Sequence, residues 1–401
     1  MNRYREDRKY IFRPPKYSHV LAPFIYLLSD IFYLRLRDKI IDVNVVSGGE
    51  DVVEKYKSNA SFLITPNHCD HSDPHVLMHL SRIYKIPIHF MAAKEIFDIN
   101  KGLNGKILQR AGIFSIDREG TDLKAIKQAM KIVFNAKYPL VMFPEGEIYH
   151  LNEKLTDMNQ GAAMIMLRTA KKMKKEKRTN GVFIFPTALK YTYIDDITPT
   201  FPQVLKRLEE KLLWKPQESL DLVERIYKFG EALLGIKEKE YLDRTLEGSL
   251  DVRLSTFREI LISRMEIYYF QALQSGKHAE RIRKLRGKIR SFLLYDKKPE
   301  KEMLEKYYND LDILHFAFQL YSYPGQYLKE KASQERIAET LLKFEEDLFH
   351  EYKIKGRRSA EVYFCPAIDL YEYLDLYKKD PKKAANEVTL KIESSIKSIL
   401  E

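Results

Sequence analysis

Residues 66–75 read PNHCDHSDPH and hold three histidines and two aspartates. This segment follows the apolar run SFLIT, which predicts a buried strand, and it precedes residues with helical spacing. Ligands of α/β proteins bind where strands end, so chemistry is expected in such a loop. His68 and Asp73 are close enough in sequence for the carboxylate to reach Nδ1 of the imidazole. Nε2 could then accept a proton, which makes His68 a candidate general base and Asp73 its orienting partner.

Two other interpretations of this segment stay open. Aspartate is a good helix N-cap, and Asp73 could serve that purpose alone. His71, His75 and His79 recur every four residues, so one helix face could present them to a zinc ion. A metal-dependent hydrolase that uses the cluster His68–His79 is therefore an alternative to a proton-transfer site.

Three further strand ends carry groups that could bind a substrate. Arg118 follows the run GIFSID, and an arginine can hold a phosphate through two parallel hydrogen bonds. Glu145 follows the run YPLVMFP and could accept hydrogen bonds from hydroxyl groups, with Pro144 and Gly146 shaping the turn. The run FIFPTALKY predicts a third strand that ends near Pro186. Because the ends of parallel strands meet at one edge of a sheet, we expect these groups to converge on the histidine.

The elements that must position these groups alternate between strand and helix. This alternation over residues 41–204 predicts an α/β domain with a mixed, largely parallel sheet flanked by helices. Residues 205–355 have only helical spacing, and strand-like sequence returns within 356–401. A single unpaired strand is not stable, so we expect the late strand to rejoin the first sheet. The prediction is an α/β domain of residues 41–204 and 356–401 with a mainly helical insertion, 205–355.

The chain has 401 residues and a net charge of +11, which favours anionic partners. Residues 1–40 combine a basic start with an aromatic-rich amphipathic segment, 19–34, as in helices of the membrane interface. Packing of this segment on the domain's own surface is an equal alternative. Two distant cysteines favour a reducing compartment.

No stretch reaches the roughly 18 apolar residues of a membrane-spanning helix, and no cleavable signal peptide is expected. We therefore expect a peripheral protein on the cytoplasmic face of a membrane, with an anionic membrane surface as one partner. The chain has no recognition motif for nucleic acid, so we expect no such partner.

In their order along the chain, four sequence blocks resemble those of the glycerolipid acyltransferases. These are the glycerol-3-phosphate and 1-acylglycerol-3-phosphate acyltransferases and their lysophospholipid relatives. The family's blocks are N-H-x4-D, G-x-F-x-[IV]-x-R, F-P-E-G and a strand that ends in proline. The matching residues are Asn67, His68 and Asp73; Gly112, Phe114, Ile116 and Arg118; Phe143 to Gly146; and Pro186. The resemblance covers roughly residues 41–200, and VYFCPAIDLYEYL looks like the family's closing strand, V-x-F-G-x-P-I-D.

The resemblance implies an acyl transfer in one step. His68, oriented by Asp73, would deprotonate a hydroxyl of glycerol-3-phosphate, 1-acylglycerol-3-phosphate or another lysolipid. The hydroxyl would then attack an acyl thioester carried by coenzyme A or acyl carrier protein. No metal and no cofactor besides this co-substrate is implied. The implied substrate-binding residues are Asn67, Gly112, Phe114, Arg118, Pro144, Glu145, Gly146 and Pro186.

The chain departs from the family pattern at four positions. Asp70 replaces the usual serine, and Glu147 replaces the usual threonine or serine. Gln160 stands where a basic residue is usual, and Cys365 where glycine is typical. The added carboxylates and the missing cation make a zwitterionic or unphosphorylated lysolipid a plausible acceptor. A non-catalytic lipid-binding relative with the same fold is a further alternative.

Overall fold

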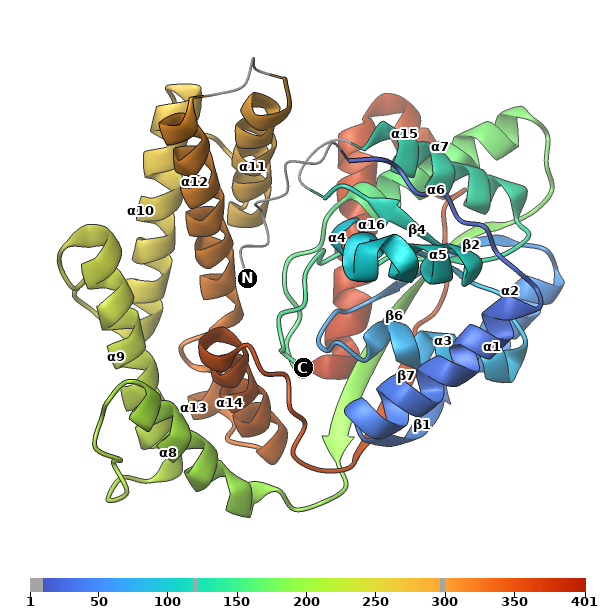
Figure 1. Ribbon diagram of the computed structural model, residues 1–401. Helices are drawn as coiled ribbons and strands as arrows, with labels where there is room; N and C mark the ends of the chain where they lie inside the picture. Colours follow the sequence, from blue (N-terminus) through green and yellow to red (C-terminus); the bar gives the residue numbers. More distant parts are fainter. Residues whose placement is uncertain (1–9, 119–121, 296–299) are drawn as a thin grey trace. The chain divides into compact units, whose positions relative to one another are not determined.

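The computed structural model describes residues 10–118, 122–295 and 300–401, and the side chains of all of these except 294 and 295 (Figure 1). The chain divides into two compact units, which we call the sheet unit and the helical unit. The sheet unit consists of Tyr10–Asp117, Asp122–Asp196 and Lys353–Glu401, and the helical unit contains Ile197–Tyr352. Residues 1–9 of the predicted membrane-interface segment lie outside the described residues.

The sheet unit contains one eight-stranded sheet with the order β1-β7-β6-β2-β5-β3-β4, and β8 pairs with β6. The pairings of β6 with β7 and β8 are antiparallel, and the other neighbours are parallel. The predicted mixed, largely parallel sheet is therefore confirmed. The strands are β1 (Ile40–Ser47), β2 (Ser61–Pro66), β3 (His89–Ala93), β4 (Ile113–Ile116), β5 (Leu140–Val141), β6 (Val182–Tyr193), β7 (Arg358–Phe364) and β8 (Ile368–Asp369).

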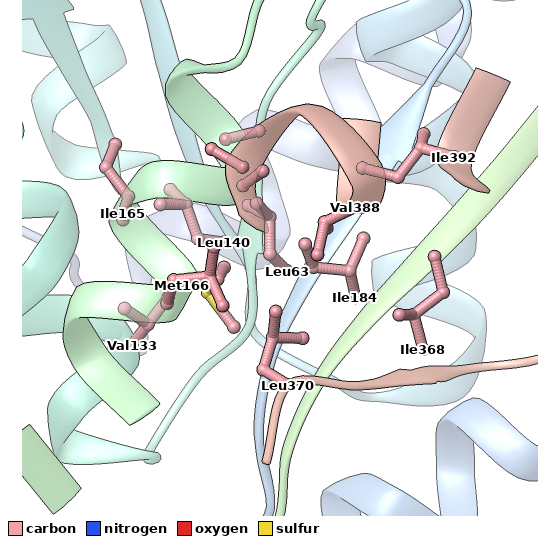
Figure 2. Packing of buried hydrophobic residues seen from close by; sticks show 14 of the residues in the cluster. Leu63, Val133, Leu140, Ile165, Met166, Ile184, Ile368, Leu370, Val388 and Ile392 are labelled. Carbon is pink, nitrogen blue, oxygen red and sulfur yellow. The ribbon is translucent and has the colours of Figure 1, made fainter. Parts of the chain in front are cut away.

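Helices cover both faces of this sheet because its central strands are apolar on both sides. Every residue of β2 is buried. Leu63 joins one core with α6, α7 and α16, which Figure 2 shows from close by, and Phe62 and Ile64 join the other core with α1, α2 and α3. The helices are α1 (Leu21–Ser29), the π-helix η1 (Asp30–Arg37), α2 (Gly49–Lys57), α3 (Asp73–Tyr84), α4 (Glu95–Asp98), the 3₁₀-helix η2 (Ile99–Gly102), α5 (Leu103–Arg110), α6 (Leu123–Asn135), α7 (Gly161–Lys175), α15 (Leu374–Lys379) and α16 (Pro381–Leu400).

The late strand, β7, rejoins the sheet. This was predicted because the helical segment before it offers no strand with which it could pair. β7 pairs with β1 on one side and with β6 on the other. A strand close to the end of the chain thus lies inside the sheet, between strands from its first half. Further along the chain, after β8 and α15, α16 buries Val388 and Ile392 against the same core as Leu63 (Figure 2).

One strand boundary differs from the prediction. The strand FIFPTALKY was expected to end near Pro186, which is wrong, because β6 continues to Tyr193. The antiparallel partner of β6 changes here, from β8 at Ile184 to β7 at Thr187. Pro186 lies between these two ladders, where its missing N–H is tolerated, and its carbonyl accepts a 2.9 Å hydrogen bond from the N–H of Cys365. The proline is therefore buried within the sheet and does not mark a strand end.

The N-terminal helices pack on the sheet unit's own surface. Ala22, Tyr26 and Leu34 of α1 and η1 are almost fully buried. The same helices leave several large apolar side chains exposed on their outer face, among them Phe24, Phe32 and Leu36. Within the described residues, no helix is long and apolar enough to cross a membrane.

The helical unit has a core of its own, which includes Phe257, Ile262, Leu285 and Leu311. From Ile197 to Tyr352, its described residues contain helices but no strand. The helices are η3 (Thr198–Thr200), α8 (Phe201–Lys211), α9 (Leu222–Leu242), α10 (Leu250–Phe270), α11 (His278–Tyr295), α12 (Lys301–Gln319), η4 (Leu320–Ser322), α13 (Tyr327–Glu330) and α14 (Gln334–Phe349).

Candidate active site

The loop 67–72 connects the carboxyl end of β2 to the start of α3. Nδ1 of His68 in this loop lies 2.8 Å from Oδ2 of Asp73, the first residue of α3. The N-H-x4-D spacing predicted this contact. A carboxylate on Nδ1 orients the ring and fixes the proton on that nitrogen, which leaves Nε2 as the acceptor. Nε2 makes no hydrogen bond to the described residues.

The carboxylate of Asp73 is itself held from several sides. Oδ2 also accepts the N–H of Asp70 at 3.0 Å, and Oδ1 accepts the hydroxyl of Tyr191 at 2.6 Å. Asp73 is completely buried. The alternative of an N-cap is not supported, because Ser72 occupies the N-cap position and the carboxylate binds the loop and β6. Asp73 is therefore fixed in position for orienting the imidazole.

The imidazole of His68 packs against an aromatic ring at the end of the neighbouring strand. Its centroid lies 4.1 Å from that of Phe143, with an angle of 24° between the ring planes. The side chain of His68 retains 14% of its exposure. The ring is thus held by one hydrogen bond and one stacking contact and still reaches solvent, as a base that meets a substrate must.

Asn67 and Glu145 hold the backbone of the loop. The amide of Asn67 makes two hydrogen bonds to the backbone of Leu189, at 3.0 and 2.7 Å. Oε1 of Glu145 accepts the N–H of His68 at 2.6 Å, and Oε2 accepts the N–H of Thr156 at 3.1 Å and its hydroxyl. Burial raises the pKa of Glu145, and these hydrogen bonds offset part of that rise. Through these contacts Asn67 and Glu145 position the loop. Their role in binding substrate stays a prediction.

A buried ion pair supports the loop from the closing strand. Nη1 of Arg358 in β7 donates to Oδ2 of Asp70 at 2.8 Å, and Nη2 donates to the hydroxyl of Ser72 at 3.2 Å. Its Nε donates to the carbonyl of Asp38 at 3.1 Å. Burial alone would raise the pKa of Asp70, but the charge and hydrogen bond of Arg358 outweigh it and hold this pKa well below its ordinary value. The carboxylate that replaces the family's serine is therefore neutralised inside the protein.

The second sequence block lies mainly within the structural core. Gly112 adopts a φ of +87°, which favours glycine, and its carbonyl oxygen lies 2.7 Å from Nδ1 of His89. Phe114 is completely buried among the residues of α6 and α7. Arg118 follows β4, is partly buried and belongs to the helical unit. The positions of Gly112 and Phe114 are those of structural residues, and the role of Arg118 at a phosphate stays a prediction.

The third block forms the turn that brings Glu145 to the loop. Gly146 adopts a φ of +84°, and its N–H donates to the carbonyl of Phe143 at 3.1 Å. The carbonyl of Pro144 accepts hydrogen bonds from the backbone and side chain of Asn159. Asn67, Phe143, Glu145 and the pair of His68 with Asp73 thus come together, whereas Phe114 and Pro186 are buried in the sheet and its core.

Two histidines of the alternative metal site, His75 and His79, bind other partners. Nδ1 of His75 lies 2.7 Å from the Ser29 hydroxyl, and its ring stacks on Tyr33 with centroids 4.5 Å apart. Nδ1 of His79 lies 3.0 Å from a carboxylate oxygen of Asp30. Burial lowers the pKa of His75 to about 3, with Arg37 and His71 adding to the effect. His75 and His79 therefore attach α3 to the N-terminal helices, which does not favour a zinc site shared along α3.

Two positioning residues were not found by sequence reasoning. Tyr191 lies within the strand pattern of β6, and Arg358 lies in a short segment read only for its strand chemistry. The one sequence feature that could have indicated Arg358 was an unusual carboxylate in the loop, Asp70, together with an arginine at the start of the closing strand. Without the sheet order, nothing in the sequence connects them.

One comparison with known proteins identifies a family for part of the chain. Residues 45–190 match the family model described as Acyltransferase. A comparison with curated proteins found no match. The matched region contains His68, Asp73 and Glu145, so it includes the pair of side chains, whereas Tyr191 lies one residue beyond its end and Arg358 far outside it. This match to the acyltransferase family over residues 45–190 is consistent with the resemblance to the glycerolipid acyltransferases.

Proposed function

We propose that this chain transfers a fatty acyl group from a thioester, on coenzyme A or acyl carrier protein, to a hydroxyl of glycerol-3-phosphate, 1-acylglycerol-3-phosphate or another lysolipid. The observation that carries the proposal is the 2.8 Å contact between Nδ1 of His68 and Asp73 within an acyltransferase-family domain. This arrangement supplies a base and no protein nucleophile. Direct attack by the acceptor hydroxyl is the reaction that it suits best.

The reaction can be written with few groups. Nε2 of His68 accepts the proton of the acceptor hydroxyl while the hydroxyl oxygen forms a bond to the thioester carbonyl carbon. The carbon–sulfur bond then breaks, and the leaving thiolate takes the proton back from the imidazolium. The products are an ester and a free thiol. Asp73 stays ionised and stabilises the imidazolium that forms between the two proton transfers.

The charges of the described residues bear on the acceptor. Asp70 is neutralised by Arg358, so the carboxylate at that position need not repel a phosphate. Gln160 remains uncharged at the position where a cation is usual, and its amide donates to Asn386 at 3.1 Å. Arg118 is the cation that we propose for a phosphorylated acceptor. Lysolipids with a zwitterionic headgroup remain acceptors to test beside glycerol-3-phosphate.

We further propose that the protein works at a membrane surface without spanning the membrane. The outer face of α1 and η1 is more apolar than the solvent-exposed face of an ordinary surface helix. The exposed large residues on this face and next to it are Val20, Leu21, Phe24, Leu27, Ile31, Phe32, Tyr33 and Leu36. The acyl chain of a lysolipid acceptor would be available there.

The test is thiol release from palmitoyl-CoA, and from an acyl carrier protein thioester, with glycerol-3-phosphate and a panel of lysolipids. We expect acceptor-dependent release that His68→Ala reduces by about 100-fold or more. The reaction should survive EDTA and His75→Ala, which keeps the base and removes one histidine of the metal alternative. Loss with EDTA would favour the metal-dependent hydrolase. No release with any donor and acceptor would favour the non-catalytic lipid-binding alternative.

A further inference from the structure

An open hollow of about 510 Å³ lies in the sheet unit where three helices end. Its lining includes Lys57, Lys85 and Lys137, together with His19 and Tyr138. Cavities of this size hold small ligands, and here the lining supplies cations and polar hydrogen atoms. The hollow is separate from the loop 67–72 and plays no part in the proposed reaction.

The position of the hollow in the fold separates it from His68. Lys57 ends α2, Lys85 follows α3, and Lys137 comes shortly after α6. The next strands, β2, β3 and β5, begin a few residues later, so the hollow lies at their amino ends. His68 follows the carboxyl end of β2, roughly 20 Å away along six residues of strand. A ligand in the hollow is therefore not the acceptor that His68 deprotonates.

The three lysines are cations that the described residues leave without an anionic partner. All three are exposed. No carboxylate in the described part of the chain pairs with any of them, and Lys137 makes a cation–π contact with Tyr138 at 5.1 Å. A lysine near a helix carboxyl end complements the helix dipole, which explains each residue singly. Three ammonium groups around one hollow repel each other, however, and a bound anion would relieve that repulsion.

The aromatic side of the hollow is ordered by contacts of its own. The hydroxyl of Tyr138 and Nε2 of His19 form a 3.0 Å hydrogen bond. Tyr17 lies against Tyr138, with centroids 5.5 Å apart, and against His89 at 6.0 Å. These contacts hold a hydroxyl and an imidazole beside the lysines, and the one polar hydrogen that their mutual hydrogen bond leaves over can be donated to a phosphate.

The exposed apolar face of α1 begins next to the hollow. Val20 follows His19 directly and is 81% exposed, and Phe24 is 57% exposed. At the other end, Tyr33 of η1 stacks on His75, two residues beyond Asp73. The apolar face therefore extends from the sheet edge where the hollow lies toward the opposite sheet edge, where the proposed active site lies. An apolar helix face beside a cluster of cations is typical of contact with anionic lipid.

We infer that the hollow binds the phosphate headgroup of an anionic phospholipid in the membrane on which α1 and η1 lie. This rests on the membrane association in the proposed function but not on acyl transfer. The bound lipid is a structural ligand that orients the sheet unit on the bilayer, with the loop 67–72 at the opposite end of the same helical face.

The test measures binding to vesicles of phosphatidylcholine with and without phosphatidic acid. The variants are Lys57→Gln/Lys85→Gln/Lys137→Gln and a control with the same loss of charge on α7, Lys171→Gln/Lys174→Gln/Lys175→Gln. Phosphatidic acid should raise the affinity of the wild type for vesicles. In the hollow variant this gain should be smaller by about 100-fold, roughly fivefold for each lysine. The control should lose less than about threefold. Both should keep the melting temperature and thiol release with a water-soluble acceptor, which makes a failure here distinguishable from a failure of the proposed function.

Three outcomes would overturn the inference. Equal losses in the two variants would show attraction by net charge without a site. No gain from phosphatidic acid in the wild type would exclude an anionic lipid. Protection of the lysines from acetylation by inorganic phosphate alone, with no further protection by vesicles, would assign the hollow to a soluble anion. Preferential protection of Lys57, Lys85 and Lys137 by phosphatidic acid vesicles supports the inference without any variant.

Discussion

Arg358 donates a 2.8 Å hydrogen bond to Asp70 across a separation of 288 residues. This ion pair connects the closing strand β7 to the loop that holds His68. Because Asp70 also accepts the N–H of Ser72 at 2.8 Å, the guanidinium fixes the end of the loop from which α3 starts. The segment after the helical unit therefore contributes a positioning residue to the proposed active site as well as a strand to the sheet.

Removal of the arginine should be costly. In Arg358→Met the carboxylate of Asp70 would stay buried without its partner, which typically costs about 3–5 kcal/mol of the free energy of unfolding. Denaturant unfolding measures the loss, and the double variant Asp70→Asn/Arg358→Met should recover part of it. Arg357→Met is the control, since Arg357 makes an exposed pair with Asp195 and should cost less than about 1 kcal/mol. Equal costs for the two arginines would contradict this account.

Tyr191→Phe removes the hydroxyl that donates to Asp73 at 2.6 Å. Burial and the charge of Asp73 raise the pKa of Tyr191 far above its ordinary value, so the hydroxyl remains a donor. We expect kcat to fall by about tenfold or more with little change in KM, because a hydrogen bond to a charged group contributes roughly 1.5–3 kcal/mol. Steady-state kinetics with a saturating thioester gives the two constants separately.

The matched control for that variant is Tyr371→Phe. The hydroxyl of Tyr371 donates to the carbonyl of Asn180 at 2.9 Å, away from the loop 67–72. This variant should keep kcat. A KM effect in Tyr191→Phe with kcat unchanged would count against a positioning role for Tyr191.

The stability of the chain should fall with acid partly through His75. Its pKa is about 3 in the folded chain, mainly because it is buried, whereas an unfolded histidine titrates near about 6.5. Between these values the unfolded chain binds more protons, so the free energy of unfolding decreases as the pH falls from about 7 toward 3. The contribution is at most about 1.4 kcal/mol per pH unit. In His75→Gln the dependence between pH 7 and 5 should be shallower, and parallel curves for the two proteins would refute the prediction.

Alanine substitutions at two glycines with nearly the same φ distinguish the cost of backbone strain from the cost of a steric clash. Gly112 has a φ of +87°, and an added Cβ would lie 2.8 Å from Tyr17 and 3.0 Å from the carbonyl of Ile88. Gly102 has a φ of +85° with no atom within 4 Å of that position. Alanine should cost about 1–2 kcal/mol at Gly102 and about 1–3 kcal/mol more at Gly112. Thermal unfolding of the two variants measures the difference, and equal costs would show that Tyr17 moves freely.

Much of the fold and of the site follows from local sequence. The alternation of strands and helices predicts the parallel sheet, since each pattern reflects which side chains a strand or helix must bury. The spacing of His68 and Asp73 predicts their contact, because a short loop between a strand and a helix leaves the two side chains few ways to separate. The boundary at Pro186 was predicted wrongly because a proline usually ends a ladder, and the change of partner from β8 to β7 is visible only in the sheet.

The sequence by itself determined the α/β class, the histidine and its carboxylate, and the turn residues around Glu145, because these depend on neighbours within a few positions. Only the tertiary structure decided which polar groups hold that pair. Tyr191 and Arg358 reach the loop through the order of the strands, and the lysines of the hollow meet because three helices end at one edge of the sheet. Long-range pairing of this kind depends on the packing of the whole sheet, and one chain's residue pattern does not encode it locally.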